Sequence, residues 1–144
     1  MSSQNLENLF KTGNLKSEPA NQGEFNGLLR SAKARLADSA NTSLAVESRF
    51  DLAYNASHAL ALAALRWHGY RSDNRYIVFQ CLEHTLRIKP EIWRVLALCH
   101  QRRNVAEYEG HLEVGDQLLA ELIAAAGLLQ RKVEALAPVK PIPP

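Results

Sequence analysis

Residues 99–110, with the sequence CHQRRNVAEYEG, place several chemically active side chains at the spacing of one helix face. Side chains three, four and seven positions apart lie on the same face of an α-helix. Four residues have this spacing, with Tyr108 one turn beyond the third of them: His100, Arg103, Asn104 and Glu107. They supply a fixed cation, an imidazole that titrates near neutrality, an amide and a carboxylate. Such a set suits binding of phosphate or ribose, and it also offers the groups needed for acid–base cleavage of RNA.

Arg103 also stands where the helical pattern calls for an apolar residue. The apolar stripe that leads to it consists of Ile92, Val95, Leu96 and Cys99. A buried arginine needs a partner, because an unpaired one costs several kcal/mol. Glu107, one turn further on, can be that partner. The polar face therefore has two other interpretations: a solvated surface, or a structural arginine that braces the bundle or a dimer seam.

Further candidate residues lie earlier in the chain. Tyr54 and His58 are one turn apart in an alanine-rich apolar segment, and we include both in the candidate binding centre. Polar groups in a buried helix usually satisfy each other or a backbone group, so a role in the core or at an interface is the alternative. A basic run around residues 66–75 can contact phosphate or complement the dipole of a helix C-terminus; it consists of Arg66, His68, Arg71 and Arg75.

The apolar periodicity predicts an all-α fold, an up-and-down bundle of four to five helices. The expected helices cover about 21–36, 43–68, 72–86, 90–110 and 116–136. Asn21 and Glu24 have the spacing of a capping box, Ser72 or Asp73 can cap the third helix, and Pro90 suits a first helical turn. Residues 1–20 are a polar segment with a possible short helix, residues 21–137 form the bundle domain, and residues 138–144 are a proline-rich tail that we expect to be extended or disordered.

The composition limits the classes of function. Seventeen basic and 15 acidic residues give a net charge of +2, so any nucleic-acid site has to be local. Cys81 and Cys99 lie in apolar helical patterns and read as buried thiols in a reducing compartment. We see no signal peptide and no apolar run long enough to cross a bilayer, so we expect a cytoplasmic protein without a membrane segment. None of the five histidines has a good ligand four residues on, so we expect neither a metal site nor a cofactor.

Two motifs resemble the HEPN superfamily (higher eukaryotes and prokaryotes nucleotide-binding domain) over roughly residues 22–136. FDLAYNASHALALAALRWHGY is similar to that family's second helix, and RRNVAEYEG is similar to its late-helix motif. The resemblance implies a five-helix bundle that commonly forms a homodimer, with the arginine motif near the dimer cleft. In active members it implies metal-independent RNA cleavage. In many others it implies partnership with a minimal nucleotidyltransferase, often as half of a toxin–antitoxin pair.

The chain departs from the family's active motif, which is an arginine followed directly by a polar residue, with a histidine further on that four to six residues separate from the arginine. Arg103 and Asn104 match its first two positions, but seven residues separate Arg103 from His111. We therefore expect a binding or partner module for a nucleotide or RNA. The alternative is a ribonuclease in which Arg103 clamps phosphate, Asn104 orients the substrate and His100 or His111 is the acid–base group. A structural bundle without a ligand is the third alternative.

Overall fold

In the computed structural model, which describes residues 2–112 and 114–140, the chain folds into helices joined by short connections. The elements are α1 (Ser2–Lys11), β1 (Lys16–Ser17), α2 (Gln22–Ser39), α3 (Val46–Trp67), β2 (Tyr70–Arg71), α4 (Arg75–Gln80), α5 (Leu82–Thr85), α6 (Pro90–Glu109) and α7 (Asp116–Glu134). In this part of the chain the strands are limited to the short β1 and β2. The predicted all-α class is confirmed.

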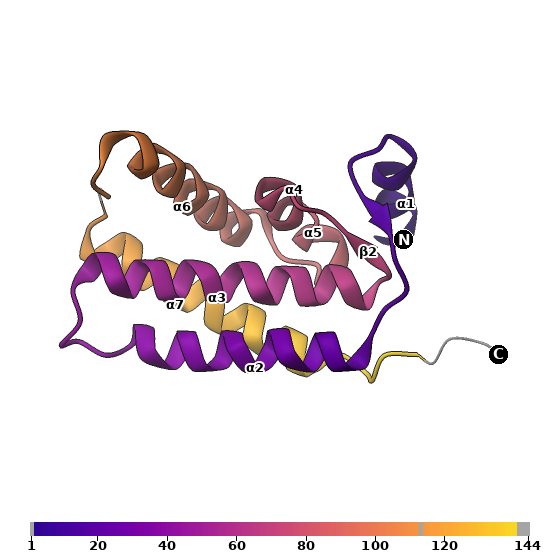
Figure 1. The fold of residues 1–144 in the computed structure, drawn as a ribbon, viewed down its shortest axis with the longest axis horizontal. Coiled ribbons are helices and arrows are strands. Elements are labelled where there is room, and N and C mark those ends of the chain that lie inside the picture. Colours follow the sequence, from indigo (N-terminus) through magenta and orange to yellow (C-terminus); the bar gives the residue numbers. More distant parts are fainter. Residues whose placement is uncertain (1, 113, 141–144) are drawn as a thin grey trace.

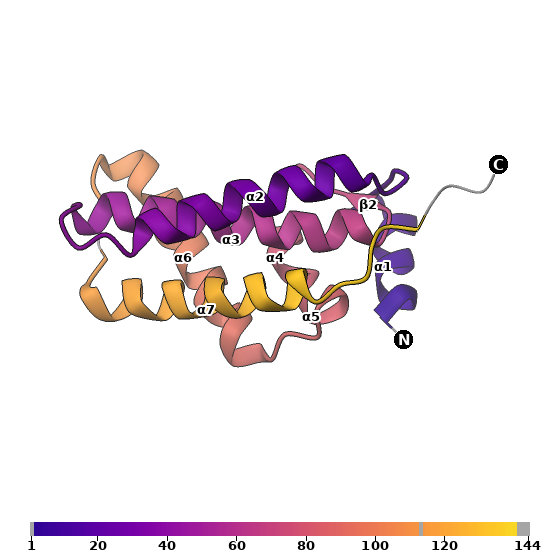
Figure 2. The same ribbon diagram turned by 90° about the horizontal axis from the view of Figure 1, so that it is seen from below.

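Helix α3 lies at the centre of the molecule. It contacts α2 and α7 as well as α4, α5 and α6, and Figures 1 and 2 show these helices arranged around it. Its alanines are buried over more than half of the helix circumference and allow close approach of its neighbours: Ala53, Ala56, Ala59, Ala61, Ala63 and Ala64. An apolar circumference of this kind is stable only when several elements cover it. The sequence pattern of α3 therefore dictates a bundle built around this helix.

The four long helices alternate in direction. Figure 1 shows α2 and α3 running antiparallel, α6 returning obliquely across α3, and α7 running back alongside it. The short α4 and α5 occupy the connection between α3 and α6. The up-and-down bundle predicted from the sequence is thus present. Its oblique third long helix, α6, forms a seam with α3 and α4, and this seam carries the candidate site.

Several helix ends follow from single residues. The side chain of Asn21 accepts a hydrogen bond from the Glu24 N–H at 2.8 Å, which caps α2 as the spacing predicts. Pro90 begins α6, where a missing N–H costs nothing. Gly110 ends α6 in the left-handed conformation at φ 79°, which glycine adopts without strain. Pro90 and Gly110 together fix the length of α6 and hence the extent of its polar face.

The predicted third helix is wrong in two respects. Residues 72–86 form two short helices, α4 and α5, separated at Cys81, and not one continuous helix. The residue that caps α4 is Asn74, whose side chain accepts from the Ile77 N–H at 3.2 Å, and not Ser72 or Asp73. Ser72 instead accepts a hydrogen bond from the Asn74 N–H. The break ends α4 at Gln80, and the first residue of α4 after the Asn74 cap, Arg75, lies beside the polar face of α6.

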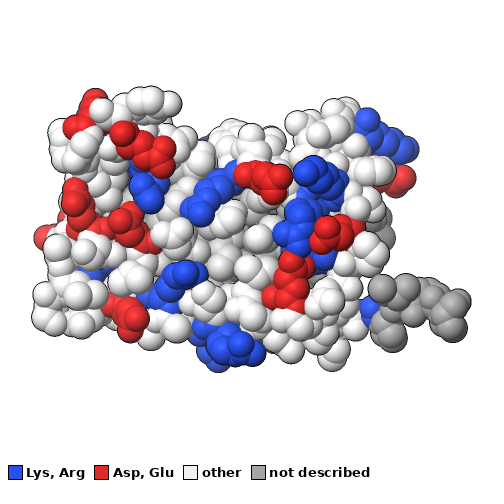
Figure 3. All heavy atoms as spheres, viewed as in Figure 1, with Lys and Arg blue, Asp and Glu red and all other residues white. Residues whose placement is uncertain are grey.

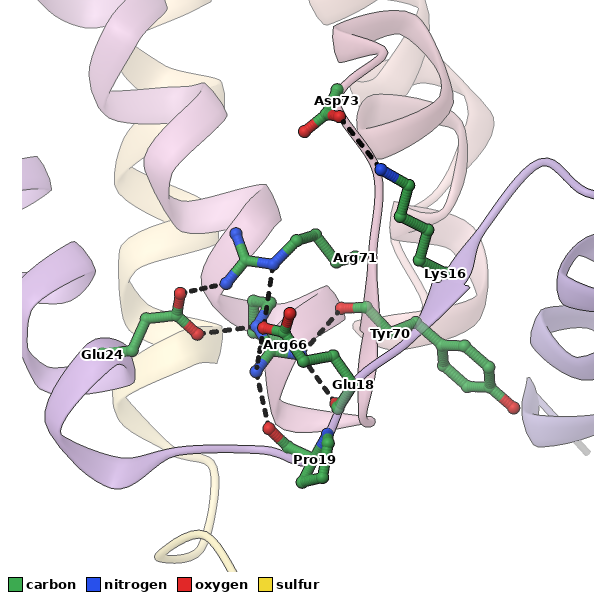
Figure 4. A network of polar contacts seen from close by, with 8 residues as sticks. All are labelled: Lys16, Glu18, Pro19, Glu24, Arg66, Tyr70, Arg71 and Asp73. Atoms are coloured by element: carbon green, nitrogen blue, oxygen red, sulfur yellow. Dashed lines mark hydrogen bonds and ion pairs between the residues drawn. The ribbon is translucent and has the colours of Figure 1, made fainter.

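The N-terminal segment is ordered against the bundle by polar contacts that sequence periodicity does not reveal. The short helix proposed for this segment is α1, and its Leu6 is fully buried. Strand β1 pairs with β2 in antiparallel register, and Arg66 beneath them is 2% exposed. Figure 4 shows Arg66 and Arg71 bound between Glu18 and Glu24. This network fastens residues 16–24 to the end of α3.

The described part of the proline-rich tail, residues 138–140, has no helical structure, as predicted, and residues 141–144 lie outside the described range. The chain leaving α7 is nevertheless held to the bundle. The Trp67 ring N–H donates to the Ala137 carbonyl at 2.8 Å, and the Val139 N–H donates to Gln22 Oε1 at 2.7 Å. Within the described residues, the helices are too short or too polar to span a bilayer.

Candidate functional site

A polar pocket of about 200 Å³ lies where α3, α4 and α6 meet. Its lining combines Tyr54 of α3, Arg75 of α4, and Arg103, Asn104 and Glu107 of α6. Leaving aside His100, which we assigned to catalysis only, four of the six candidate binding residues therefore lie together, and the other two are His58 and Tyr108. The structure adds Arg75, which sequence analysis had placed in the separate basic run around residues 66–75.

Arg103 lies in the seam between α6 and α3, with 34% of its side chain exposed. Its Nε is 3.2 Å from Asp51 Oδ1, and its Nη1 is 3.9 Å from Glu107 Oε1. The closer partner is thus Asp51 of the neighbouring helix, whereas the sequence suggested Glu107 on the same helix. The Nε atom is buried, and it makes no hydrogen bond to the described residues because its contact with Asp51 is poorly aligned. The guanidinium group is positioned at the seam while part of it faces the pocket.

His100 connects the pocket to the core through both ring nitrogens. Its Nδ1 is 2.9 Å from the Tyr54 hydroxyl oxygen, and its Nε2 is 3.2 Å from Asn104 Nδ2. With the amide oriented so that Nδ2 donates, Nδ1 carries the proton and donates to Tyr54. The ring also packs against Phe79 with centroids 6.2 Å apart. His100 therefore orients Asn104 and Tyr54, two residues that line the pocket.

The electrostatics of the site keep its histidines neutral. Burial, together with the nearby Arg75 charge, lowers the pKa of His100, although Glu107 opposes this shift. Burial and the charge of Arg75 lower the pKa of His58 to about 4. Burial raises the pKa of Tyr54, so its hydroxyl stays protonated at neutral pH. The positive charge in the pocket at pH 7 therefore comes from its two arginines, Arg75 and Arg103.

Arg75 is aimed at the pocket by two contacts with α3. Its Nη1 donates to Asn55 Oδ1 at 3.1 Å, and its guanidinium carbon lies 5.5 Å from the centre of the Tyr54 ring. The second contact is a cation–π interaction, which holds the planar guanidinium against a rigid aromatic face. Arg75 and Arg103 thus approach the same pocket from two different helices.

Two of the residues assigned to binding from the sequence do not line this pocket. Tyr108 is 91% exposed and extends from α6 into solvent. His58 is half-buried within the bundle, edge-on to Phe79 with ring centroids 6.0 Å apart.

His111 lies beyond the end of α6 and lines a second pocket of about 180 Å³ that includes Arg103 and Asp51. Arg103 therefore stands between two pockets, with His111 on one side and His100 on the other.

The other residues of the basic run, Arg66, His68 and Arg71, bind groups within the fold. Arg66 donates to the carbonyl oxygens of Glu18 at 2.8 Å and Pro19 at 2.6 Å, in addition to its ion pairs. Arg71 is bound to the same glutamates, and His68 donates to the Thr85 carbonyl at 3.3 Å. Of the run, Arg75 alone lines the pocket at the seam of α3, α4 and α6. The sequence gives one indication of this network: Arg66 lies within an apolar helix, and a buried arginine needs partners.

Elsewhere the described residues offer little competing chemistry. They contain no group of three or more side chains suited to holding a metal ion. Cys81 and Cys99 are buried and unpaired, as predicted, and burial raises the pKa of each thiol to about 12. Figure 3 shows acidic and basic residues interspersed over one face of the molecule, without an extended patch of one sign. Other depressions are also lined by cations, such as the one beside Arg30 and Lys33 on α2. What distinguishes the seam is that arginines from two different helices line one pocket there.

Comparison of the chain with family models, with curated proteins and with solved structures found no match.

Proposed function

We propose that the protein is a HEPN-like binding module whose pocket takes the phosphate of a ribonucleotide, either free or within RNA. The observation that carries this proposal is the convergence of Arg75 and Arg103 from different helices on one pocket. Two guanidinium groups offer forks of N–H donors that match phosphate oxygens. Asn104 adds a neutral amide, and its orientation is set by His100.

Glu107 favours a ribose-bearing ligand over a simple anion. A carboxylate in the same pocket repels phosphate, so a site built for inorganic anions gains nothing from it. The same carboxylate is a strong acceptor for a sugar hydroxyl, which is a donor that ribonucleotides carry next to the phosphate. The combination of two cations and one acceptor therefore fits a phosphate with an attached ribose.

The arrangement supports binding better than cleavage. Both ring nitrogens of His100 are engaged, so proton transfer to a substrate would require breaking a contact with Tyr54 or Asn104. Its lowered pKa also leaves little of the protonated acid at pH 7. The competing proposal, a ribonuclease, draws on His111, which shares the second pocket with Arg103. Incubation with RNA in EDTA separates the two: a binding module leaves the RNA intact, whereas a metal-independent ribonuclease cuts it.

The salt dependence of RNA binding tests the phosphate pocket. For single strands, the slope of log affinity against log salt concentration changes by about 0.7 for each phosphate contact. Arg75→Gln and Arg103→Gln should each lower the affinity and reduce that slope by about 0.7. Arg30→Gln is the matched control, because it removes an exposed arginine from α2, on the opposite side of α3 (Figure 1).

Equal slopes for the wild type and for both pocket variants would contradict the proposal. So would a loss of affinity in Arg30→Gln as large as in the pocket variants. If the wild type binds neither RNA nor nucleoside phosphates, the structural bundle without a ligand is the better account.

The protein partners form a separate part of the proposal and rest on the resemblance to the HEPN superfamily. They are a second copy of the chain and a minimal nucleotidyltransferase from a toxin–antitoxin pair. Light scattering tests the first by measuring the mass in solution. An adjacent reading frame that encodes a small nucleotidyltransferase, followed by copurification of the two proteins, tests the second.

A further inference from the structure

A larger and more apolar depression of about 630 Å³ lies beside the polar pocket, between α4 and α6. We call it the α4–α6 groove, and the residues that shape it for this argument are Tyr76, Ala97, Leu98, Gln101, Asn104 and Val105. Three of them are large apolar side chains with substantial exposure, and Tyr76 is 43% exposed. Apolar side chains that gather at a concave surface mark a binding site more often than single exposed residues do.

The groove and the polar pocket adjoin each other. Asn104 lines both of them, and Arg75 and Tyr76 are consecutive residues of α4 that line one each. The polar pocket, at about 200 Å³, is smaller than the roughly 300 Å³ at which ligand sites usually begin. It can hold a phosphate and part of a sugar, so the remainder of a nucleotide has to lie outside it. The adjoining space is the α4–α6 groove.

We propose that the α4–α6 groove takes the nucleobase of the ribonucleotide whose phosphate lies between Arg75 and Arg103, with the base stacked on Tyr76. This inference rests on the proposed function, since it identifies the second half of the same ligand. The charge distribution supports this orientation of the ligand, because two arginines line the polar pocket, whereas the groove is mostly apolar and has one arginine, Arg94, in its lining.

Tyr76 has the properties of a stacking platform. Its ring is supported edge-on by Trp93, with centroids 6.0 Å apart at 68°, and lies 6.2 Å from the His100 ring. An aromatic side chain held in this way loses little conformational freedom when a base stacks on it. Stacking on aromatic residues is how many proteins bind single-stranded nucleic acids without strict sequence preference. The amides of Gln101 and Asn104 offer donors and acceptors to the edge of the base.

The test compares two ligands and three variants. Fluorescence anisotropy measures the affinity for a short single-stranded RNA and for an abasic oligomer of the same length and charge. Tyr76→Ala should weaken RNA binding by about ten-fold or more, because each stacked base contributes strongly to affinity. Tyr76→Phe keeps the ring and should bind as the wild type does. Tyr108→Ala, which removes an exposed tyrosine outside the groove, should also have no effect.

The abasic oligomer separates the groove from the phosphate pocket. It should bind the wild type about as weakly as RNA binds Tyr76→Ala, and Tyr76→Ala should not weaken it further. If Arg103→Gln weakens RNA binding but Tyr76→Ala does not, the groove inference fails while the phosphate pocket stands. If the wild type binds no RNA or nucleotide, the proposed function itself fails. If Tyr76→Ala changes the oligomeric mass and leaves RNA affinity unchanged, the groove holds a second copy of the chain and the inference is overturned.

Discussion

Replacing Arg66 with methionine is the sharpest test of what holds the N-terminal segment to the bundle. Arg66 is 2% exposed, and its guanidinium donates to Glu24 Oε1 at 2.6 Å and forms an ion pair with Glu18 at 3.1 Å. It also donates to the backbone carbonyls of Glu18, Pro19 and Tyr70. Methionine keeps the apolar stem of the side chain in place, so the change removes mainly the charge and its hydrogen bonds.

The expected loss is about 3 kcal/mol of unfolding free energy. Removing one member of a buried ion pair costs roughly 3–5 kcal/mol, because the partner charge and its acceptors are left unpaired. Glu18 and Glu24 are partly exposed, and Glu24 keeps its contact with Arg71, so water compensates some of the loss. We therefore expect Arg66→Met to lose unfolding free energy at the lower end of this range. Arg71→Met, at a side chain that is 27% exposed, should cost about 1 kcal/mol or less.

Urea unfolding followed by circular dichroism measures both variants under the same conditions. A second measurement follows stability into acid and concerns Glu24. Burial alone would raise the pKa of this carboxyl group, but the hydrogen bonds from Arg66 and Arg71 lower that pKa below 4.5. A lowered folded pKa stabilises the protein above pH 4.5, and that contribution disappears as the pH falls through the folded value. The stability gap between the wild type and Glu24→Gln should therefore narrow below pH 4.5. A loss in Arg66→Met no larger than in Arg71→Met would refute the reasoning.

Three further predictions concern the seam and the core. Asp51→Asn removes the carboxylate nearest to Arg103 and should strengthen RNA binding by up to about five-fold in a direct titration; weaker binding would show that Asp51 positions the arginine. The pKa of His58 is about 4 in the folded protein and 6.5 in the unfolded chain, so between these pH values only the unfolded chain binds the proton. The free energy of unfolding should therefore fall by up to about 3 kcal/mol as the pH is lowered from 6.5 to 4. His58→Gln should lack this dependence in acid titrations of stability. Cys81 and Cys99 should resist a thiol reagent at pH 8 until urea unfolds the protein, and fast labelling of the folded state would contradict their burial.

The sequence predicts most of the helical architecture, because the helices bury apolar stripes whose spacing is visible in the chain. The ends of helices are predicted where one residue determines them, as Asn21, Pro90 and Gly110 do. The break at Cys81 is not predictable in this way, since the apolar pattern continues through it. Neither is the pairing of β1 with β2, because two residues per strand carry no periodicity.

In the candidate site, the sequence predicts the residues that share one helix face but not those that come from other helices. The face containing Arg103, Asn104 and Glu107 follows from helical spacing within one element. Arg75 joins them from α4, and Asp51 approaches Arg103 from α3, through packing that local sequence does not encode. Arg66 fits the pattern of a cation on an apolar helix face better than Arg103 does, and the fold buries Arg66. Arg66 is held by Glu18 and Glu24, which lie more than forty residues away in the chain. The local sequence therefore does not show which of the two arginines is buried.

The most direct measurement of the central claim is the NMR response of the arginine side chains to uridine monophosphate. The Nε–H signals of Arg75 and Arg103 should shift together and saturate during the titration, while the signal of Arg30 on α2 stays in place. Shifts confined to other arginines, or a titration that moves Arg75 and Arg103 no more than Arg30, would contradict a ribonucleotide phosphate site at the seam of α3, α4 and α6.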